Sequence, residues 1–366
     1  MTPAIEFKVT HEAMTSEGFI VNRDDLILIT GANGFIGPHV VESLLNLGFC
    51  NLRCFVRSTS NLTKIGALGA RSYNDVRIEV IRGNLLSVSD CITATKDVAI
   101  VIHLAAGRGE KSFPDAFLNS VVTTRNLLEA SLTHRCLRRF VNISSFAVYD
   151  NMARSSNTLD ETCPLESPAH RRGEAYCFAK IKQDQLVFDY GKRFAIPHVI
   201  VRPGYVYGPG KKAISGRVGI DTFGVFLHLG GSNIIPFTYV ENCADAIALA
   251  GVMADVDGEI FNVVDDQLPS SREVLRLYKK NVRRFRSLYV PHIVSYALCR
   301  LWEWYSKWSQ EQLPPVFNRS RWYANWRTTR YSNKKLKARL GWKQRVSTSA
   351  GLALFFEGCR QGPSRA

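Results

Sequence analysis

Tyr176 and Lys180 have the residue types and the spacing needed for proton transfer. Their four-residue separation, in a segment compatible with a helix, places both side chains on one helical face. A tyrosine with its ordinary pKa of about 10 is a poor base at neutral pH, and an adjacent ammonium group favours the phenolate. Ser145 offers a hydroxyl to the substrate oxygen whose carbon gains or loses a hydride. An isolated Tyr-x-x-x-Lys pair is more often a surface pair, so the accompanying elements decide the interpretation.

A glycine-rich turn lies far upstream of this pair. The apolar run 26–29 suits a strand buried on both faces of a parallel sheet, and Gly31, Gly34 and Gly37 follow it before the helical pattern of 38–47. In such a unit the glycines permit a tight turn, a close approach of backbone to a pyrophosphate, and close packing of helix on strand. The phosphates would lie at the helix N-terminus. The pattern therefore predicts a dinucleotide site.

Further buried strands are predicted at four later segments: 52–56, 76–82, 97–106 and 139–143. Ligands bind at the carboxyl edge of an open α/β sheet, so the residues that follow each strand are candidates for the site. Arg57 stands where an NAD-selective site usually places an acidic residue, and it favours the 2′-phosphate of NADP. Asn84 is able to hydrogen-bond an adenine edge. His103 is interpreted as structural, because the candidate acid/base pair lies elsewhere.

The composition fits an enzyme-sized globular protein, with 366 residues of which 46% are hydrophobic. Nine cysteines without paired metal-ligand spacing predict reduced thiols in the cytoplasm, with neither a metal site nor a disulfide framework. Residues 1–23 lack the apolar core of a secretory signal and are interpreted as a short extension. The net charge of +15 is interpreted mainly as a solvated basic face, since no nucleic-acid-binding motif accompanies it.

Taken in chain order, six blocks resemble those of the extended short-chain dehydrogenase/reductase family: 30–37, 101–106, 119–130, 141–149, 176–180 and 201–210. This family includes nucleotide-sugar epimerases, dehydratases and 3β-hydroxysteroid dehydrogenase-like enzymes. The resemblance implies an α/β fold, with a Rossmann doubly wound parallel sheet and a smaller, interwoven C-terminal substrate-binding α/β region. It divides the chain into an extension (1–24), an NAD(P)-binding domain (25–205) and a mainly substrate-binding region (206–366) with elements that return to the first domain.

The resemblance also implies the site residues. The family's catalytic serine lies four residues before the tyrosine of a Val-Tyr pair, which selects Ser145 over Ser144 and gives the triad Ser145, Tyr176 and Lys180. The implied cofactor-binding residues are Gly31, Asn33, Gly34, Phe35, Ile36, Gly37, Arg57, Asn84, Leu85, Leu104, Ala105, Ala106, Asn119, Tyr176, Lys180 and Pro203. NADP(H) is the preferred cofactor, with NAD(H) as the alternative. The helices expected at 119–132 and 176–190 imply a homodimer.

Two departures from family patterns bear on the reaction. Phe146 and Ala147 follow Ser145 where 4,6-dehydratases carry Asp-Glu, so an agent for the elimination of water is missing and a dehydratase is disfavoured. Arg-Thr-Thr-Arg-Tyr-Ser at 327–332 stands where nucleotide-sugar epimerases have an Arg-Pro-x-Asp-like block. Its arginines can still bind a diphosphate. This departure therefore weakens the epimerase interpretation but does not exclude it.

The segment 290–308 repeats apolar side chains at helical spacing. It carries too much charge to span a bilayer, and its position resembles the hydrophobic insertion of 3β-hydroxysteroid and sterol-4-carboxylate dehydrogenases, which bind apolar substrates near membranes. With five basic residues within 279–286, one interpretation is peripheral contact with a membrane. The favoured interpretation is a helix packed over the substrate pocket.

The leading hypothesis is an NADP-preferring oxidoreductase that interconverts a secondary alcohol and a ketone on a bulky, sterol-like or isoprenoid-like substrate. The alternative is a nucleotide-sugar 4-epimerase similar to UDP-glucose 4-epimerase, in which the same triad oxidises the sugar and then reduces the opposite face of the ketone. A non-catalytic dinucleotide-sensing protein comes third, because the triad is intact. The expected location is the cytoplasm, with contact at a membrane surface as a further option.

Overall fold

A parallel sheet of seven strands forms the centre of the protein. The computed structural model describes residues 18–69, 76–107, 112–211, 214–222, 224–309 and 317–361. Within these residues the strand order is β12-β7-β5-β4-β1-β2-β3, and every neighbouring pair is parallel. The strands are β1 (Ile27–Thr30), β2 (Asn51–Val56), β3 (Arg77–Arg82), β4 (Ile100–His103), β5 (Arg139–Ile143), β7 (His198–Pro203) and β12 (Ile260–Val263). The predicted doubly wound parallel sheet is confirmed.

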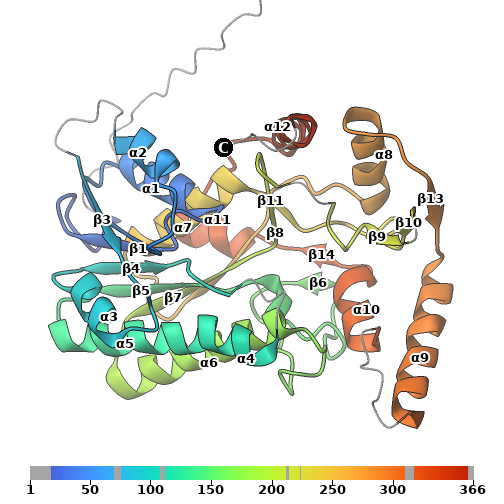
Figure 1. The fold of residues 1–366 in the computed structure, drawn as a ribbon, viewed down its shortest axis with the longest axis horizontal. Helices are drawn as coiled ribbons and strands as arrows, with labels where there is room; N and C mark the ends of the chain where they lie inside the picture. The colour runs from blue at the N-terminus through green and yellow to red at the C-terminus, as the bar shows by residue number, and fades with distance from the viewer. Residues whose placement is uncertain are drawn as a thin grey trace, which may run out of the picture.

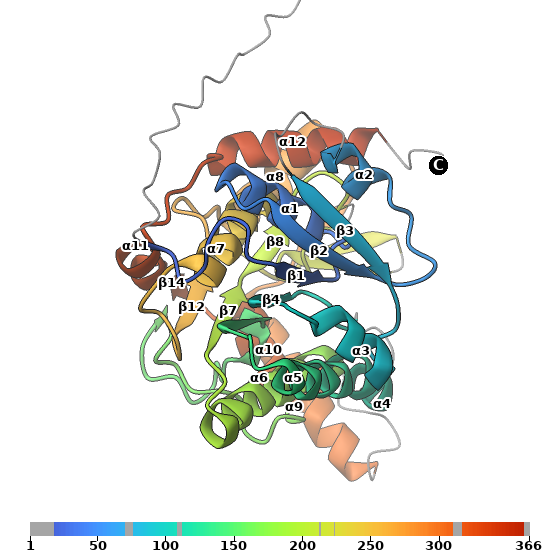
Figure 2. The ribbon, with the colours of Figure 1, turned by 90° about the vertical axis from the view of Figure 1, so that its left-hand side faces the viewer.

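Helices cover both faces of the sheet, as Figures 1 and 2 show. One face carries α1 (Gly37–Asn46), α2 (Thr63–Gly69), α7 (Val240–Val252) and α11 (Lys334–Leu340). The opposite face carries α3 (Val88–Thr95), α5 (Thr123–His134) and α6 (Ala175–Phe194). Each face of the sheet therefore packs into its own apolar cluster, and β1, β4, β5 and β7 contribute to both. This explains why these strands are continuous apolar runs in the sequence.

The strand order reverses between β1 and β4, because the chain leaves β1 toward β2 on one side and later returns to β4 on the other. A crevice forms at the carboxyl ends of strands at such a point, and it is where ligands bind in this architecture. The turn after β1, the residues after β4 and the segment after β5 all meet there. The fold thus brings the sequence-predicted site segments to one edge.

The second half of the chain builds a smaller region beside this edge. It contains β8 (Tyr205–Tyr207) paired with β11 (Phe237–Tyr239), and β9 (Gly219–Thr222), β10 (Val225–His228) and β13 (Ser287–Tyr289) in a separate sheet. Its helices are α8 (Ser271–Asn281), α9 (His292–Trp308), α10 (Arg319–Trp326) and α12 (Thr348–Arg360). The short strands β6 (Thr158–Leu159) and β14 (Arg330–Tyr331) pair with each other. Because α7 and β12 return to the central sheet, the two regions share one core.

The ends of two predicted elements differ from expectation. The helix expected at 119–132 begins earlier, as α4 (Phe113–Ala116), and runs through a π-helical turn, η2 (Phe117–Val122), before α5. Of the proposed N-terminal extension, residues 1–17 lie outside the described residues, while Phe19 forms a bridge with Met253 at the end of α7. Since Phe19 also packs on Phe49, at a ring-centroid distance of 5.4 Å, this part of the extension belongs to the folded core.

Helix α9 lies within the predicted amphipathic segment, but its orientation differs from the favoured interpretation. Most of its large apolar side chains are exposed, while Ser295, Cys299 and Ser306 are buried. Two of its aromatic residues, Tyr296 and Trp302, pack inward on Trp322 and Phe317. The helix rests on α10 instead of closing over a substrate pocket with its apolar side (Figure 1). Among the described residues, no helix has the length and apolar character needed to cross a bilayer.

Candidate active site

The turn after β1 has the backbone geometry of a dinucleotide cradle. Gly31 has a φ of +69°, and a Cβ there would lie 2.9 Å from the amide nitrogen of Ala105, which follows β4. A Cβ at Gly37 would lie 2.2 Å from the carbonyl oxygen of Ala32, so only glycine allows α1 to start this close to the turn. The N-terminus of α1 has no side-chain cap, which leaves its first amides to an anion. These features fit a bound pyrophosphate.

Ser145 and Tyr176 meet at the carboxyl edge of β5. Ser145 opens the 3₁₀ turn η3 (Phe146–Val148), and its hydroxyl is hydrogen-bonded to the Tyr176 phenol near the start of α6. Burial raises the pKa of Tyr176, while the hydrogen bond with Ser145 lowers it. The neighbouring Ser144 instead donates to Oδ2 of Asp184 at 2.9 Å. Ser144 is therefore bonded to Asp184, while Ser145 lies beside Tyr176.

Lys180 lies one turn after Tyr176, as its spacing predicted, but its amine is directed elsewhere. Its Nζ donates to the carbonyl oxygen of Ile143 at 2.6 Å and to Oε1 of Gln183 at 3.0 Å. Burial lowers the pKa of Lys180 to about 8, and Asp184 opposes this shift. The expected lowering of the Tyr176 pKa by Lys180 is not found in this arrangement, because the amine is turned toward Ile143 and Gln183 and burial dominates at the phenol.

A buried hydrogen-bond chain extends from Lys180 back to β1. Gln183 Nε2 donates to Oγ1 of Thr124 at 2.7 Å, and Thr124 donates to the carbonyl oxygen of Ser120 at 2.6 Å. Nε2 of His103 lies 2.9 Å from the same Thr124 oxygen, so Nε2 must be the protonated nitrogen. Its Nδ1 then accepts from Thr30 at 2.7 Å. The chain fixes the Gln183 amide with its oxygen toward Lys180.

His103 is held neutral within this chain. Burial, with a smaller effect of the Lys180 charge, lowers the pKa of His103 to about 3. Both of its ring nitrogens are used by threonine hydroxyls, so it offers no free position for proton exchange with a substrate. This geometry agrees with the structural role expected from the sequence.

Asp184, four residues after Lys180 on α6, ties that helix to the sheet. It accepts hydrogen bonds from Asn142 at 3.0 Å and from Ser144, and it forms a buried ion pair with Arg202 at 3.0 Å. The Arg202 guanidinium also lies over the ring of Tyr149, 4.9 Å from its centroid. The sequence analysis missed Asp184, although its spacing from Lys180 places it on the same helical face. It fixes the position of α6 relative to the segment that carries Ser145.

The residues predicted for the adenosine end lie at the ends of β2 and β3. Arg57 is exposed directly after β2, in a turn whose carbonyl groups at Ser58 and Ser60 accept hydrogen bonds from Arg82 at 2.6 and 3.3 Å. The fold therefore adds a second arginine at this corner. Asn84 is exposed and its side-chain oxygen accepts from the Leu86 amide, so in this structure the amide group stabilises its own turn. Leu85, which follows it, is buried.

The remaining predicted cofactor residues divide into two groups. Leu104, Ala105 and Ala106 follow β4 beside Gly31 and are partly exposed, and Pro203 ends β7. Phe35 and Ile36 pack partly against the apolar cluster of the second region, and Asn33 is partly exposed in the glycine turn. Asn119 lies in the π-helical turn and donates to the carbonyl and side-chain oxygens of Asp115. Among these residues, Asn119 is the one whose side chain is engaged away from the cradle.

The sequence analysis identified only one member of an arginine pair that lies near Ser145. Arg154 is buried, and its Nη2 donates to Thr329 at 2.8 Å while Nε and Nη1 have no hydrogen-bond partner. Arg327 lies close by and, with burial, lowers the Arg154 pKa. Within the described residues neither arginine forms an ion pair with a carboxylate. Tyr331 lies beside them and stacks on Phe146, the neighbour of Ser145, with ring centroids 5.7 Å apart.

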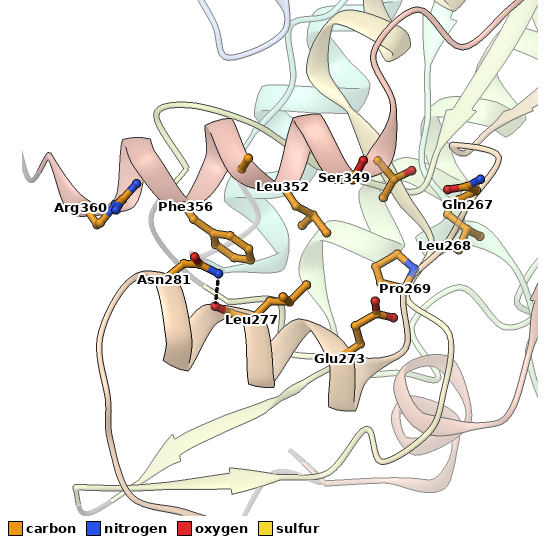
Figure 3. Close-up of a pocket in the computed structure, with 12 residues that line it drawn as sticks. Gln267, Leu268, Pro269, Glu273, Leu277, Asn281, Ser349, Leu352, Phe356 and Arg360 are labelled. Carbon is orange, nitrogen blue, oxygen red and sulfur yellow. Dashed lines mark hydrogen bonds between the residues drawn. The ribbon is translucent and has the colours of Figure 1, made fainter. Parts of the chain in front are cut away.

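A separate cleft of about 410 Å³ lies between α8 and α12 (Figure 3). Leu352 and Phe356 of α12 point toward Leu277 of α8, with Glu273 and Arg360 near opposite ends of the helices. None of the residues proposed for the triad or the dinucleotide cradle lines this cleft. No group of histidine, cysteine or carboxylate side chains within the described part of the chain is arranged to hold a metal ion.

Comparisons with known proteins agree with this geometry. A trifunctional UDP-glucose 4,6-dehydratase/UDP-4-keto-6-deoxy-D-glucose 3,5-epimerase/UDP-4-keto-L-rhamnose-reductase of Arabidopsis thaliana is 24% identical over 274 residues, which are 70% of this chain and 40% of that protein. The chain thus spans about two fifths of that relative's length. A 3beta-hydroxysteroid-dehydrogenase/decarboxylase of the same plant is 24% identical over 251 residues, covering 64% of this chain and 54% of its own.

Solved structures show the same fold. The UDP-glucuronic acid 4-epimerase from Bacillus cereus, determined with UDP-glucuronic acid and NAD, superposes with a TM-score of 0.68 at 23% identity, and covers 92% of this chain and 99% of its own. The model of the NAD dependent epimerase/dehydratase family matches residues 27–263, which include the glycine turn, Ser145, Tyr176 and Lys180. The protein therefore belongs to the NAD dependent epimerase/dehydratase family of enzymes.

Proposed function

We propose that this protein interconverts a secondary alcohol and a ketone on the sugar of a nucleotide sugar, with epimerisation as the overall reaction. The observation that carries this proposal is the pair formed by buried Arg154 and partly exposed Arg327, which have no carboxylate partner among the described residues and lie across one aromatic stack from Ser145. The named relatives, several of which act on nucleotide sugars, support this substrate class over the sterol-like or isoprenoid-like substrate expected from the sequence.

An anionic substrate would relieve the cost of burying Arg154. A buried guanidinium whose donors lack partners is costly, because its hydration is lost without replacement. A diphosphate supplies acceptors in the geometry that the planar guanidinium prefers. Arg217, which donates to the hydroxyl of Tyr331 at 3.4 Å, adds a third positive charge nearby. A diphosphate at this position would leave the attached sugar on the Phe146 side, toward Ser145.

Ser145 and Tyr176 would carry the proton-transfer part of the reaction. Ser145 donates to the reacting oxygen and orients it, while Tyr176 exchanges a proton with that oxygen. During oxidation the hydroxyl proton passes to the tyrosine oxygen, and during reduction the same proton returns to the ketone oxygen. A nicotinamide cofactor held by the glycine turn would supply the hydride acceptor and donor for this interconversion. Lys180 would supply the positive charge that stabilises the ionised form of Tyr176. To do so, its amine would turn from Gln183 toward a bound ribose.

The first test is the identity of the nucleotide that the purified protein releases on denaturation, together with turnover of UDP-glucose and UDP-glucuronate. The purified protein is expected to release a stoichiometric amount of nicotinamide nucleotide and to convert both substrates to their 4-epimers. In Tyr176→Phe the turnover should be abolished or strongly reduced, while the release of nucleotide should persist. Release of no nucleotide, with reduction of apolar ketones by added NADPH, would contradict the epimerase. Tyr190→Phe is the matched control, because Tyr190 is a surface tyrosine on the same helix, bonded to Glu129.

The substrate class is tested separately by UDP binding. Arg154→Gln and Arg327→Gln should each weaken UDP affinity by about tenfold to a hundredfold, as expected for the loss of a charge-assisted hydrogen bond. Isothermal titration calorimetry measures the affinity, and circular dichroism checks that the variants fold. Arg193→Gln, at an exposed position near the end of α6, is the control with an equal change of charge. Unchanged UDP affinity in both variants would remove the basis for a nucleotide-sugar substrate.

We also propose that the adenosine end accepts the 2′-phosphate of NADP(H). Arg57 follows β2 where the ribose hydroxyls are recognised in this architecture, and Arg82 braces the same turn. In an Arg57→Asp variant the ratio of NADPH to NADH affinity, measured by quenching of protein fluorescence, should fall at least tenfold. An unchanged ratio of NADPH to NADH affinity would show that Arg57 is a surface residue that does not bind the 2′-phosphate.

A second candidate reaction keeps the same site with a different substrate. A dehydrogenase for a bulky apolar alcohol is favoured by the exposed apolar side of α9 and by the likeness to the 3beta-hydroxysteroid-dehydrogenase/decarboxylase. This candidate predicts net consumption of NAD(P)H with ketones and no affinity for UDP.

The homodimer implied by the resemblance also stays a proposal. Phe188 lies in the helix at 176–190, one of the two that imply the homodimer. Its ring packs within its own chain against His198, at a ring-centroid distance of 5.7 Å.

A further inference from the structure

Helix α9 exposes a continuous row of large apolar side chains. Ile293 is 84% exposed, Leu301 60%, Trp304 65% and Trp308 69%. At 100° per residue, all members of the row fall within an arc of roughly 140°. The row, called here the α9 stripe, consists of Ile293, Val294, Ala297, Leu298, Leu301, Trp304, Tyr305 and Trp308. Proteins without a partner rarely expose contiguous apolar surface of this kind, which marks it as an interaction surface.

The opposite side of α9 is fixed to the protein by polar contacts and by aromatic contacts of Tyr296 with Trp322 and of Trp302 with Phe317, at ring-centroid distances of 5.0 and 6.3 Å. Ser295 accepts a hydrogen bond from the Trp322 indole at 2.9 Å, and Glu303 forms an ion pair with Arg319 at 2.7 Å. Both partners belong to α10, which lies between α9 and the rest of the protein (Figure 1). Because these contacts determine which side faces inward, the α9 stripe points outward as a consequence of the fold.

Positive charge surrounds the α9 stripe. Arg300 and Lys307 lie on α9 at one margin of the stripe, and both are exposed. The segment from the end of α8 through β13 leads directly into α9 on the same side of the molecule, as Figure 1 shows. Its exposed basic residues are Lys280, Arg283, Arg284 and Arg286, of which Lys280, Arg284 and Arg286 are called here the α8–β13 cluster. Leu288 and Tyr289 of β13 are also exposed and extend the apolar surface toward this cluster.

We propose that the α9 stripe and the α8–β13 cluster form a docking surface for a bilayer with anionic lipids. Tryptophan and tyrosine prefer the boundary between headgroups and acyl chains, and leucine and isoleucine partition below it. Basic side chains around such a helix are attracted to anionic headgroups. A second copy of this chain would bring the same basic residues together across a two-fold axis, which is unfavourable. The charge pattern thus favours an anionic lipid surface as the occupant.

Docking in this way would place the membrane close to the segment that leads into the active site. Helix α10 contacts that segment directly, because Asn318 donates to the carbonyl oxygen of Arg172 at 2.9 Å and Arg321 pairs with Glu174 at 2.8 Å. Glu174 caps the start of α6, two residues before Tyr176. The docked helix therefore connects to the site through two short contacts. This inference is independent of the substrate class proposed above.

The test is co-sedimentation of the full chain with vesicles of phosphatidylcholine, with and without phosphatidylserine. Wild-type protein is expected to bind the vesicles that contain phosphatidylserine and to show blue-shifted tryptophan emission on binding. A stripe variant, Leu301→Gln/Trp304→Gln/Trp308→Gln, should lose binding. The matched control is Val88→Gln/Phe194→Gln/Leu354→Gln, which removes three exposed apolar side chains elsewhere and should bind like wild type. Thermal unfolding of each variant verifies folding.

A charge variant tests the second half of the proposal. Lys280→Gln/Arg284→Gln/Arg286→Gln should weaken binding by about two orders of magnitude, since each basic residue near an anionic surface contributes about a factor of five. Lys96→Gln/Lys192→Gln/Arg193→Gln is the control for net charge. Binding that survives in the stripe variant, or absence of binding in wild type, overturns the proposal. So does a wild-type dimer that becomes a monomer in the stripe variant, measured by light scattering, because the occupant is then a second copy.

Discussion

Gln183 accepts a hydrogen bond from Lys180. The orientation of its own amide is set by hydrogen bonds with residues that are far away in the sequence. A lysine amine has donors only, so it requires the oxygen side of the Gln183 amide. The nitrogen side is taken by Thr124, whose hydroxyl is in turn shared with His103. Buried networks of this kind are rigid because every member is satisfied. Gln183 is therefore a positioning residue for Lys180.

Replacing Gln183 should move the alkaline limit of activity in opposite directions for two variants. Lys180 loses its proton near its pKa of about 8, and the charge that it would lend to Tyr176 in the proposed reaction disappears with that proton. Gln183→Glu places a carboxylate at the ammonium and should shift the alkaline limb of the kcat profile to higher pH. Gln183→Met removes the acceptor and should shift it to lower pH. The kcat profile is measured from pH 6 to pH 10. This range of about 4 pH units extends below and above the pKa of Lys180.

A purely structural role for Gln183 would lower kcat equally at every pH in both variants. Gln185→Met is the control, because Gln185 lies two residues further on α6 and accepts a hydrogen bond from the exposed Lys182 at 3.0 Å. Its profile should coincide with that of the wild type.

At the scale of elements, the contact between β1 and α1 decides whether the dinucleotide cradle exists. Gly37→Ala forces a Cβ to within 2.2 Å of the Ala32 carbonyl oxygen, so α1 must move away from the turn. We expect a loss of about 1–3 kcal/mol in the free energy of unfolding, as for other overpacked sites. The affinity for NAD(P) should fall with it, because the amides at the start of α1 move away from the pyrophosphate. Thermal unfolding and titration with NADH measure the two effects.

Gly66→Ala is the matched control for this prediction. Gly66 lies inside α2, and a Cβ there would meet no atom within 4 Å. The change should leave NADH binding intact and stabilise the protein by about 0.5–1 kcal/mol, because alanine is a better helix former than glycine. Equal behaviour of the two variants would show that close packing at Gly37 is not required.

At the scale of the whole molecule, Asp265 joins the central sheet to the second region. It follows β12, and it accepts hydrogen bonds from the Tyr239 amide and the Asn242 side chain, both at 3.0 Å. Asn242 also holds Val346 on the way into α12. Burial raises the pKa of Asp265 well above that of an ordinary aspartate, to about 7, and the hydrogen bonds from Asn242 and Tyr239 only partly oppose this.

This carboxyl should make global stability depend on pH in a defined direction. Between about pH 4 and about pH 7 folded Asp265 keeps a proton that the unfolded chain has released, so its contribution is full below this window and falls as pH rises through it. The decline amounts to at most about 4 kcal/mol. Asp265→Asn should remove it, seen as a flatter pH dependence of urea unfolding than in wild type. The exposed Asp221→Asn should keep the wild-type slope, and equal slopes in all three proteins would contradict the prediction.

Local sequence signals were sufficient for the elements that form the cofactor half. The run of four apolar residues before Gly31 predicted β1, and the predicted span 139–143 coincides with β5. The four-residue spacing of Tyr176 and Lys180 gave their common face on α6. These features depend on the periodicity of apolar residues, on a tight turn and on glycines that lack a side chain. Each of them is specified by residues that are neighbours in the sequence. The sequence predicted them for that reason.

Only the tertiary structure decided which partners the side chains meet. Periodicity revealed an apolar side on 290–308, but its direction depends on Ser295 and Glu303 meeting α10, which is encoded far along the chain. Likewise nothing local indicates that Arg154 is buried beside Arg327, 173 residues away, or that Lys180 faces Gln183. Amphipathicity, charge and spacing are properties of a segment by itself. Burial and pairing are properties of two segments, and they exist only once the sheet has brought those segments together.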